Sequence, residues 1–147
     1  MEPFTTRPSP QLVGGPGSLA ELPSCVHKSG GQKVLLVTDK GVAAAGHAGR
    51  AVTLLEDAGI ACTVYDGTSE NPEESDILAA MKFAREVGPD CFVGIGGGSS
   101  MDTAKGCNFL LTNGGAMSDY KGYGSARTPL LPFIGVPTTA GTGSECQ

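Results

Sequence analysis

A glycine run followed by hydroxyl side chains is the stretch of this sequence best suited to binding an anion. Three glycines at positions 96–98 come directly after an apolar run at 91–95, and Ser99 and Ser100 open a segment with helical spacing. Glycines between a strand and a helix let the backbone approach a ligand closely, and the helix start offers free N–H groups at the positive end of a dipole. The pattern predicts a phosphate or diphosphate site. The alternative is a tight turn in which Ser99 or Ser100 only caps the helix.

Two further strand ends carry polar side chains. Asp39 follows the apolar run at 33–38, and its carboxylate can accept hydrogen bonds from an adenosine ribose and repel a 2′-phosphate. The alternative is a cap on the following helix. Thr138, Thr139 and Thr142 lie among glycines after another apolar run, where their hydroxyls can bond phosphate, ribose or a nicotinamide amide. The alternative there is a turn that satisfies its own backbone.

Other polar residues near these turns have weaker signals. We expect Asp102, near the helix start, to bond local amides and shape the glycine turn, and Lys105 to be a solvated lysine or a charge offered to a phosphate. Asn71 is expected to cap a helix that has proline in its first position, and such a cap can also face a ligand. His27 and His47 lie in polar surroundings, which favours surface positions over metal ligation.

These residues need a scaffold, and strand and helix patterns alternate along the chain. Strands are expected at 12–13, 33–38, 61–65, 91–95 and 130–136, with a helix from Asn71 to Gly88 among those between them. Short links force parallel pairing with right-handed crossovers. The fold is therefore expected to be α/β, a doubly wound, mainly parallel, Rossmann-like sheet. The three polar loops should converge at the carboxyl ends of its strands.

Composition narrows the classes of partner. The 147 residues are 39% hydrophobic with a formal net charge of -5 and no basic cluster, which argues against nucleic acid and anionic membranes. Neither a membrane span nor a signal peptide is predicted, so a cytoplasmic location is expected. Five cysteines without a CxxC pair are expected to be reduced and mostly buried.

Several common catalytic motifs are absent from the sequence. It contains no HExxH pair, no G-x-S-x-G elbow and no G-x-x-x-x-G-K-[ST] loop, which argues against a zinc protease, a serine hydrolase and a P-loop NTPase. The simple G-x-G-x-x-G fingerprint does not fit either, because the acidic residue precedes the glycines here. A variant dinucleotide site, with its diphosphate loop on a later strand, is the remaining prediction.

Two signatures resemble those of a known family. Residues 96–105 read GGGSSMDTAK, which resembles the GGGSxxDxAK signature of the iron-containing (group III) alcohol dehydrogenases, and residues 137–145 read PTTAGTGSE, which resembles their second signature. Asp39 and the pair at 71–72 are also similar to family positions. The resemblance covers essentially the whole chain. It implies an N-terminal NAD(P)-binding domain followed by an all-helical domain.

The resemblance also implies roles for individual residues. It assigns Asp39 to the adenosine ribose, residues 97–100 to the diphosphate and the three threonines to the lining of the cofactor site. Asn71 and Asp102 are included with them. The set expected to bind the cofactor is Asp39, Asn71, Gly97, Gly98, Ser99, Ser100, Asp102, Thr138, Thr139 and Thr142.

The resemblance further implies that the helical domain of the full-length enzyme binds a divalent metal, iron or zinc, through one aspartate and three histidines. The chain has two histidines and stops at Gln147. We therefore expect residues 1–147 to be a dinucleotide-binding domain truncated before the helical domain, binding NAD in preference to NADP and lacking turnover alone. The full-length enzyme is expected to act on a small alcohol or aldehyde as a homo-oligomer. The alternatives are a non-catalytic nucleotide-binding module, or one half of an enzyme like glycerol dehydrogenase or dehydroquinate synthase.

Overall fold

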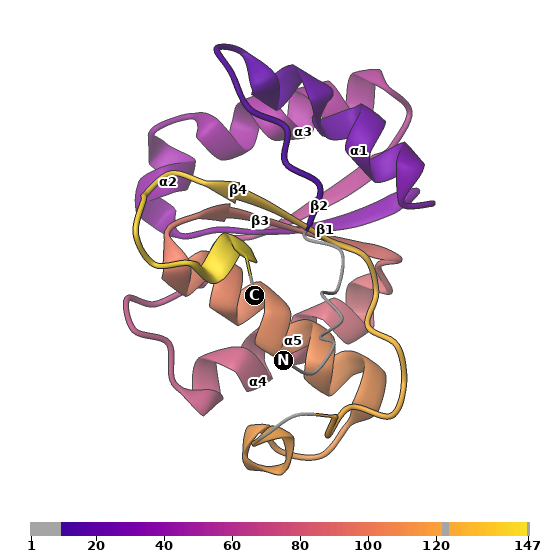
Figure 1. The fold of residues 1–147 in the computed structure, drawn as a ribbon, viewed down its shortest axis with the longest axis vertical. Coiled ribbons are helices and arrows are strands. Elements are labelled where there is room, and N and C mark those ends of the chain that lie inside the picture. Colours follow the sequence, from indigo (N-terminus) through magenta and orange to yellow (C-terminus); the bar gives the residue numbers. More distant parts are fainter. Residues whose placement is uncertain (1–9, 122–123, 147) are drawn as a thin grey trace, which may run out of the picture.

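The computed structural model describes residues 10–121 and 124–146, which form a parallel sheet covered by helices on both faces (Figure 1). The strands are β1 (Lys33–Val37), β2 (Ala61–Tyr65), β3 (Cys91–Gly96) and β4 (Phe133–Pro137), in the order β2-β1-β3-β4. The three pairs of neighbouring strands are all parallel, with Val34 opposite both Cys62 and Cys91. The doubly wound α/β prediction is confirmed.

The helices form two layers around this sheet. On one side lie α1 (Leu22–Lys28) and α3 (His47–Asp57), and on the other lie α4 (Glu74–Val87) and α5 (Gly98–Asn113) (Figure 1). The short elements are η1 (Ser18–Glu21), α2 (Lys40–Ala44), η2 (Met117–Tyr120) and η3 (Ser144–Cys146). Among the described residues, no helix combines the length and the apolar character needed to cross a membrane.

The two central strands explain why the apolar runs lack alternation. Leu36 packs in the core beneath α1 and α3, whereas its neighbour Leu35 packs in the core shared with α4 and α5. All of β3 is buried, and β1 is buried after its first residue. A strand covered on both faces must be apolar at every position, so the continuous runs correctly predicted parallel strands.

The strand order also fixes where a ligand can bind. The chain leaves β1 toward β2 on one side, while β3 lies on the other side of β1. Between β1 and β3 the order of connection therefore reverses, and the loops that follow these two strands leave toward opposite faces of the sheet. In open α/β sheets such a switch point opens a crevice outside the carboxyl ends of the strands.

Three local predictions need correction. Leu12 and Val13 form no strand; they are exposed and run into a glycine-rich turn. Asn71 does not cap α4, because Glu73 has the extended backbone of a cap and donates its N–H to Asp76 Oδ2 at 2.8 Å, so the helix begins at Glu74. The last strand begins at Phe133 rather than at 130, and the predicted arm at 1–10 lies almost entirely outside the described residues.

Candidate functional site: a cleft at the carboxyl edge of the sheet

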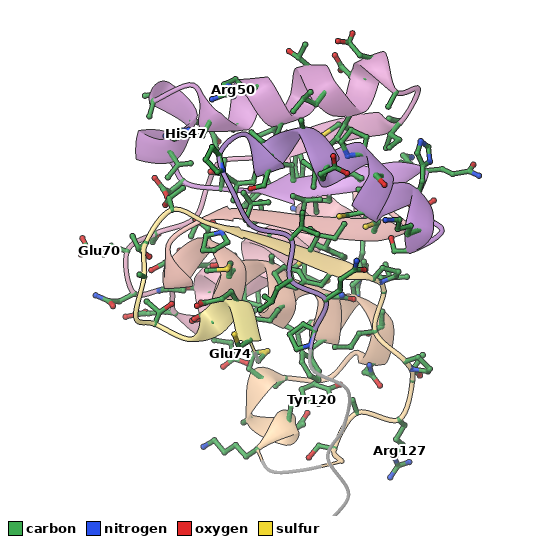
Figure 2. All side chains as sticks on the ribbon, turned by 45° about the horizontal axis from the view of Figure 1, so that its top comes forward. His47, Arg50, Glu70, Glu74, Tyr120 and Arg127 are labelled. Carbon is green, nitrogen blue, oxygen red and sulfur yellow. The ribbon has the colours of Figure 1, made fainter. Side chains whose placement is uncertain are left out.

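A cleft of about 770 Å³ lies at the carboxyl edge of the sheet and is lined from the loops that follow all four strands. Glu70, on the loop after β2, lies at this edge near the yellow loop after β4 (Figure 2). The lining residues are Asp39, Lys40, Gly41, Val42, Asp66, Gly67, Thr68, Ser69, Glu70, Gly97, Gly98, Ser99, Thr138 and Thr139.

The cleft brings together six of the ten residues predicted from the sequence to bind a ligand. They come from three separate strand ends, as the convergence of loops in a parallel sheet requires. The six are Asp39, Gly97, Gly98, Ser99, Thr138 and Thr139; the four outside the lining are Asn71, Ser100, Asp102 and Thr142.

Two of the three glycines in the turn at 96–98, Gly96 and Gly98, are packed too closely for other side chains. Gly96 has φ of 145°, and a Cβ at that position would lie 2.5 Å from Ser100 Oγ and 3.3 Å from Asp39 Oδ2. A Cβ on Gly98 would lie 3.1 Å from Ser144 Oγ. The turn therefore depends on glycine both for its backbone conformation and for the close approach of its neighbours.

The start of α5 opens into the cleft without a side-chain cap. Gly97 is the N-cap residue and no side chain bonds the first amides of the helix. Ser99 Oγ instead accepts the Asn71 N–H at 3.3 Å, and Ser100 Oγ points to Asp39, so the capping alternative is wrong for both serines. The amides at the start of this long helix remain directed at the cleft, which is the chemistry of an anion site.

Asp39 is held by contacts to both carboxylate oxygens. Oδ1 accepts the Val42 N–H at 2.9 Å, and the nearly fully buried Ser100 donates to Oδ2 at 3.3 Å. The predicted alternative of a helix cap is thus correct for α2. It does not compete with ligand binding, because each carboxylate oxygen accepts more than one hydrogen bond and Asp39 still lines the cleft.

The segment at 138–144, which we call the threonine loop, covers the β4 end of the cleft. Thr138 donates its N–H to the Gly96 carbonyl at 2.8 Å, and a Cβ on Gly97 would lie 3.4 Å from Thr139 Oγ1. Thr142 lies outside the lining: its Oγ1 accepts the Ser144 N–H at 3.3 Å. One predicted threonine therefore satisfies its own loop, as the alternative interpretation proposed, while the other two face the cleft.

Asp102 and Lys105 lie on α5 behind the turn. Lys105 Nζ donates to the Ser144 carbonyl at 2.7 Å and lies 3.4 Å from Asp102 Oδ1. Asp102 therefore pairs with a lysine, where a bond to local amides was expected. Lys105 is mostly buried, with 17% of its side chain exposed, so the prediction of a solvated lysine is wrong.

The loop after β2 was missed as a contributor to the cleft. Asp66, Thr68 and Glu70 line it, and Thr68 is 8% exposed with an Oγ1 that has no hydrogen-bond partner among the described residues. The sequence carried the signal, since the strand at 61–65 was predicted and every strand of a parallel sheet ends at the same edge. The loop was missed because its composition, with two carboxylates, is also that of an ordinary polar turn.

The remaining candidate chemistry concerns histidine and cysteine side chains among the described residues. No group of three or more His, Cys, Asp or Glu side chains there is placed to hold a metal ion, and His27 and His47 are exposed as predicted. The five cysteines are free, but only two of them are buried, so the expectation of mostly buried cysteines is wrong. Cys91 and Cys107 are buried but Cys146 is exposed, and burial raises the pKa of Cys107 to about 12, so that buried thiol is unreactive.

Comparisons with known proteins agree with this geometry. The model of the family described as iron-containing alcohol dehydrogenase matches residues 9–147. Alcohol dehydrogenase 4 of Saccharomyces cerevisiae is 40% identical over 131 residues, covering 89% of this chain and 34% of that protein. The chain thus spans about a third of the length of this relative.

Solved structures of alcohol dehydrogenases and related reductases are also similar to this chain. The crystal structure of a 1,3-propanediol oxidoreductase superposes with a TM-score of 0.86 at 34% identity, covering 90% of this chain and 35% of that one. Sulfoacetaldehyde reductase from Bifidobacterium kashiwanohense, solved in complex with NAD+, gives a TM-score of 0.75 at 32% identity, covering 89% and 35%.

Proposed function

Because the chain belongs to the iron-containing alcohol dehydrogenase family, we propose that residues 1–147 are the dinucleotide-binding domain of an NAD-dependent alcohol dehydrogenase. The complete enzyme transfers a hydride between the nicotinamide and a small alcohol or aldehyde. One observation carries the proposal for this chain: Asp39, the uncapped start of α5 and the threonine loop meet in a single cleft.

The strand order supports a particular orientation for the dinucleotide. Across the sheet, Asp39 follows β1, the glycine turn follows β3 and Thr138 follows β4. In this order a ribose at Asp39 is followed by a diphosphate at the start of α5 and by the nicotinamide half at the threonine loop. The glycine turn fits a diphosphate because it brings backbone, and no side chain, to the cleft.

The charges in the cleft support NAD rather than NADP. Asp39, Asp66 and Glu70 gather on the loops after β1 and β2, and Lys40 is the one cationic side chain among the lining residues. Three carboxylates at the ribose end repel the 2′-phosphate that distinguishes NADP, whereas they accept hydrogen bonds from ribose hydroxyls.

The chain's own residues do not fit the metal that its family name implies. A divalent metal supplies polarisation of the alcohol oxygen. Among the described residues, no three or more His, Cys, Asp or Glu side chains come together to hold one. The role we propose for this chain is therefore to bind and orient the cofactor, and residues 1–147 alone should give no metal-dependent alcohol oxidation above the buffer rate.

Calorimetry with NADH and NADPH tests the proposal. We expect NADH to bind at least about tenfold more tightly, because one repulsive or lost charge contact is worth about 1.4 kcal/mol or more. Asp39→Asn keeps a cap for α2 but removes the charge, so it should reduce the difference in affinity between NADH and NADPH. The matched control is Glu86→Gln, which neutralises an exposed residue on α4. Equal affinities in the unaltered chain, or binding of neither nucleotide, would overturn the proposal.

A further inference from the structure

Lys105 lies behind the cleft, yet among the described residues it makes the shortest hydrogen bond to the threonine loop. Its Nζ donates to the Ser144 carbonyl at 2.7 Å, and 17% of its side chain is exposed. Ser144 is 4% exposed and is the first residue of η3. A charged donor to a carbonyl in such a sheltered place is stronger than a neutral bond at the surface.

The rest of the threonine loop is poorly anchored. Residues 138–142 are exposed, and a Cβ added at Gly141 would have nothing within 4 Å. At its start the loop is tied by the Thr138 N–H to the Gly96 carbonyl at 2.8 Å. At its end it is tied by Lys105, so the two bonds hold an exposed segment at both ends.

The end of the loop also packs on the glycine turn. A Cβ on Gly98 would lie 3.1 Å from Ser144 Oγ and 3.2 Å from Thr142 Cβ. The bond from Lys105 therefore draws the loop against the first residue of α5, the helix that carries the lysine itself. Asp102, at 3.4 Å from Nζ, orients the lysine on the helix surface.

We propose that Lys105 is a positioning residue that sets the height of the threonine loop over the cleft, and so controls binding of the nicotinamide half of the cofactor. This inference rests on the proposed function for the identity of the ligand. Lys105 does not line the cleft. Its effect reaches the ligand through Ser144 and the loop that carries Thr138 and Thr139.

The strand order gives the proposal a distinctive consequence. In the proposed orientation ADP would extend over the loops after β1 and β3, whereas NADH would also reach the loop after β4, the next strand in the sheet. Lys105→Met should therefore weaken NADH about tenfold and leave ADP within about twofold, because only the loop loses a charged hydrogen bond. Lys105→Arg keeps a charged donor and should recover most of the NADH affinity.

Two measurements test this in residues 1–147, with Lys82→Met as the control because Lys82 is exposed on α4. Titration with NADH and ADP gives the ratio of affinities. Hydrogen exchange of the amides at 138–144, without any nucleotide, reports the tether itself, and Lys105→Met should speed it about tenfold while the strands stay protected.

The outcomes separate this inference from the proposed function. If the unaltered chain binds no nucleotide, the proposed function fails, while faster exchange in Lys105→Met still supports the tether. Exchange equal to that of Lys82→Met would overturn the inference, as would equal losses of NADH and ADP affinity. If Lys105→Met does not fold, the same comparison is made with Lys105→Gln, and an NADH to ADP ratio identical to the unaltered protein would again overturn it.

Discussion

The two sides of the cleft are built in opposite ways. On one side Gly96, Ser100 and Asp39 interlock so closely that a Cβ at Gly96 would lie 2.5 Å from a hydroxyl oxygen. On the other side the threonine loop is exposed over residues 138–142, and a Cβ at Gly141 would meet nothing within 4 Å. Both sides contain glycines with positive φ, but only on the first side do neighbouring side chains pack closely around such a glycine.

This difference indicates how the two sides handle a ligand. The packed side has its geometry fixed before anything binds, which lowers the ordering cost of binding. The loop side depends on a few hydrogen bonds, and segments with few buried contacts open most readily. A cleft with one rigid and one adaptable wall can grip a diphosphate while a loop adjusts to the group beyond it.

Alanine substitutions at Gly96 and Gly141, one on each side of the cleft, should give the largest difference between the two sides. Gly96→Ala combines an unfavourable φ of 145° with a severe overlap, so we expect it to lower the free energy of unfolding by about 3 kcal/mol. Gly141→Ala meets only the backbone strain of its φ of 103° and should cost about 1 kcal/mol. Urea unfolding monitored by circular dichroism gives both values.

The pair of variants is its own control, since each replaces a glycine of positive φ by the same residue. Similar losses of stability would show that the turn at Gly96 relaxes around a methyl group and that the packed side is no more rigid than the loop. A loss for Gly141→Ala that exceeded the loss for Gly96→Ala would reverse the assignment of rigid and adaptable walls.

The sequence predicted the scaffold well because its signals are local and strong. The continuous apolar run at 34–37 predicts a strand covered on both faces, and glycines at 96–98 between a strand and a helix predict a tight turn. Parallel pairing then brings the loops to one edge. Asp39 lies beside the glycine turn because of this topology, although 57 residues lie between Asp39 and Gly97 in the chain.

The directions of individual side chains depended on details that the sequence does not contain. Ser99 and Ser100 differ by one position on a helix, a rotation of about 100°, and this sends one to the cleft and the other to Asp39. The start of α4 was misplaced because Glu73 with Asp76 makes a better cap than Asn71. Lys105 finds its partner on a loop 39 residues away, which no local pattern reveals.

The pH dependence of stability should also distinguish the two sides of the cleft, because each side has a nearby cysteine. Cys107 is buried on α5, and burial raises its pKa to about 12, whereas Cys146 is exposed after the threonine loop. A raised pKa means that the fold favours the neutral thiol. Its contribution to stability is fully present below the unfolded value near 9 and is lost as the pH rises through about 12.

Between pH 8 and 10, Cys107→Ala should therefore lose about 1 kcal/mol less unfolding free energy than the unaltered chain. Cys146→Ala removes an exposed cysteine and serves as the control, so it should follow the unaltered chain. Denaturant unfolding at the two pH values provides the comparison. An identical loss in all three proteins would show that α5 opens to solvent as easily as the loop does.

Ser100→Ala should give the smallest effect and test how finely the packed side holds Asp39. Loss of the hydrogen bond at 3.3 Å frees one carboxylate oxygen to rotate, and we expect NADH to bind about threefold more weakly with NADPH unchanged. Ser118→Ala, an exposed serine on η2, is the control. If Ser100 acts through Asp39, adding Ser100→Ala to Asp39→Asn should change the ratio of NADH to NADPH affinity no further, because the two substitutions remove the same interaction. Additive effects would mean that Ser100 acts on the ligand independently and that the interlock at Gly96 serves packing alone.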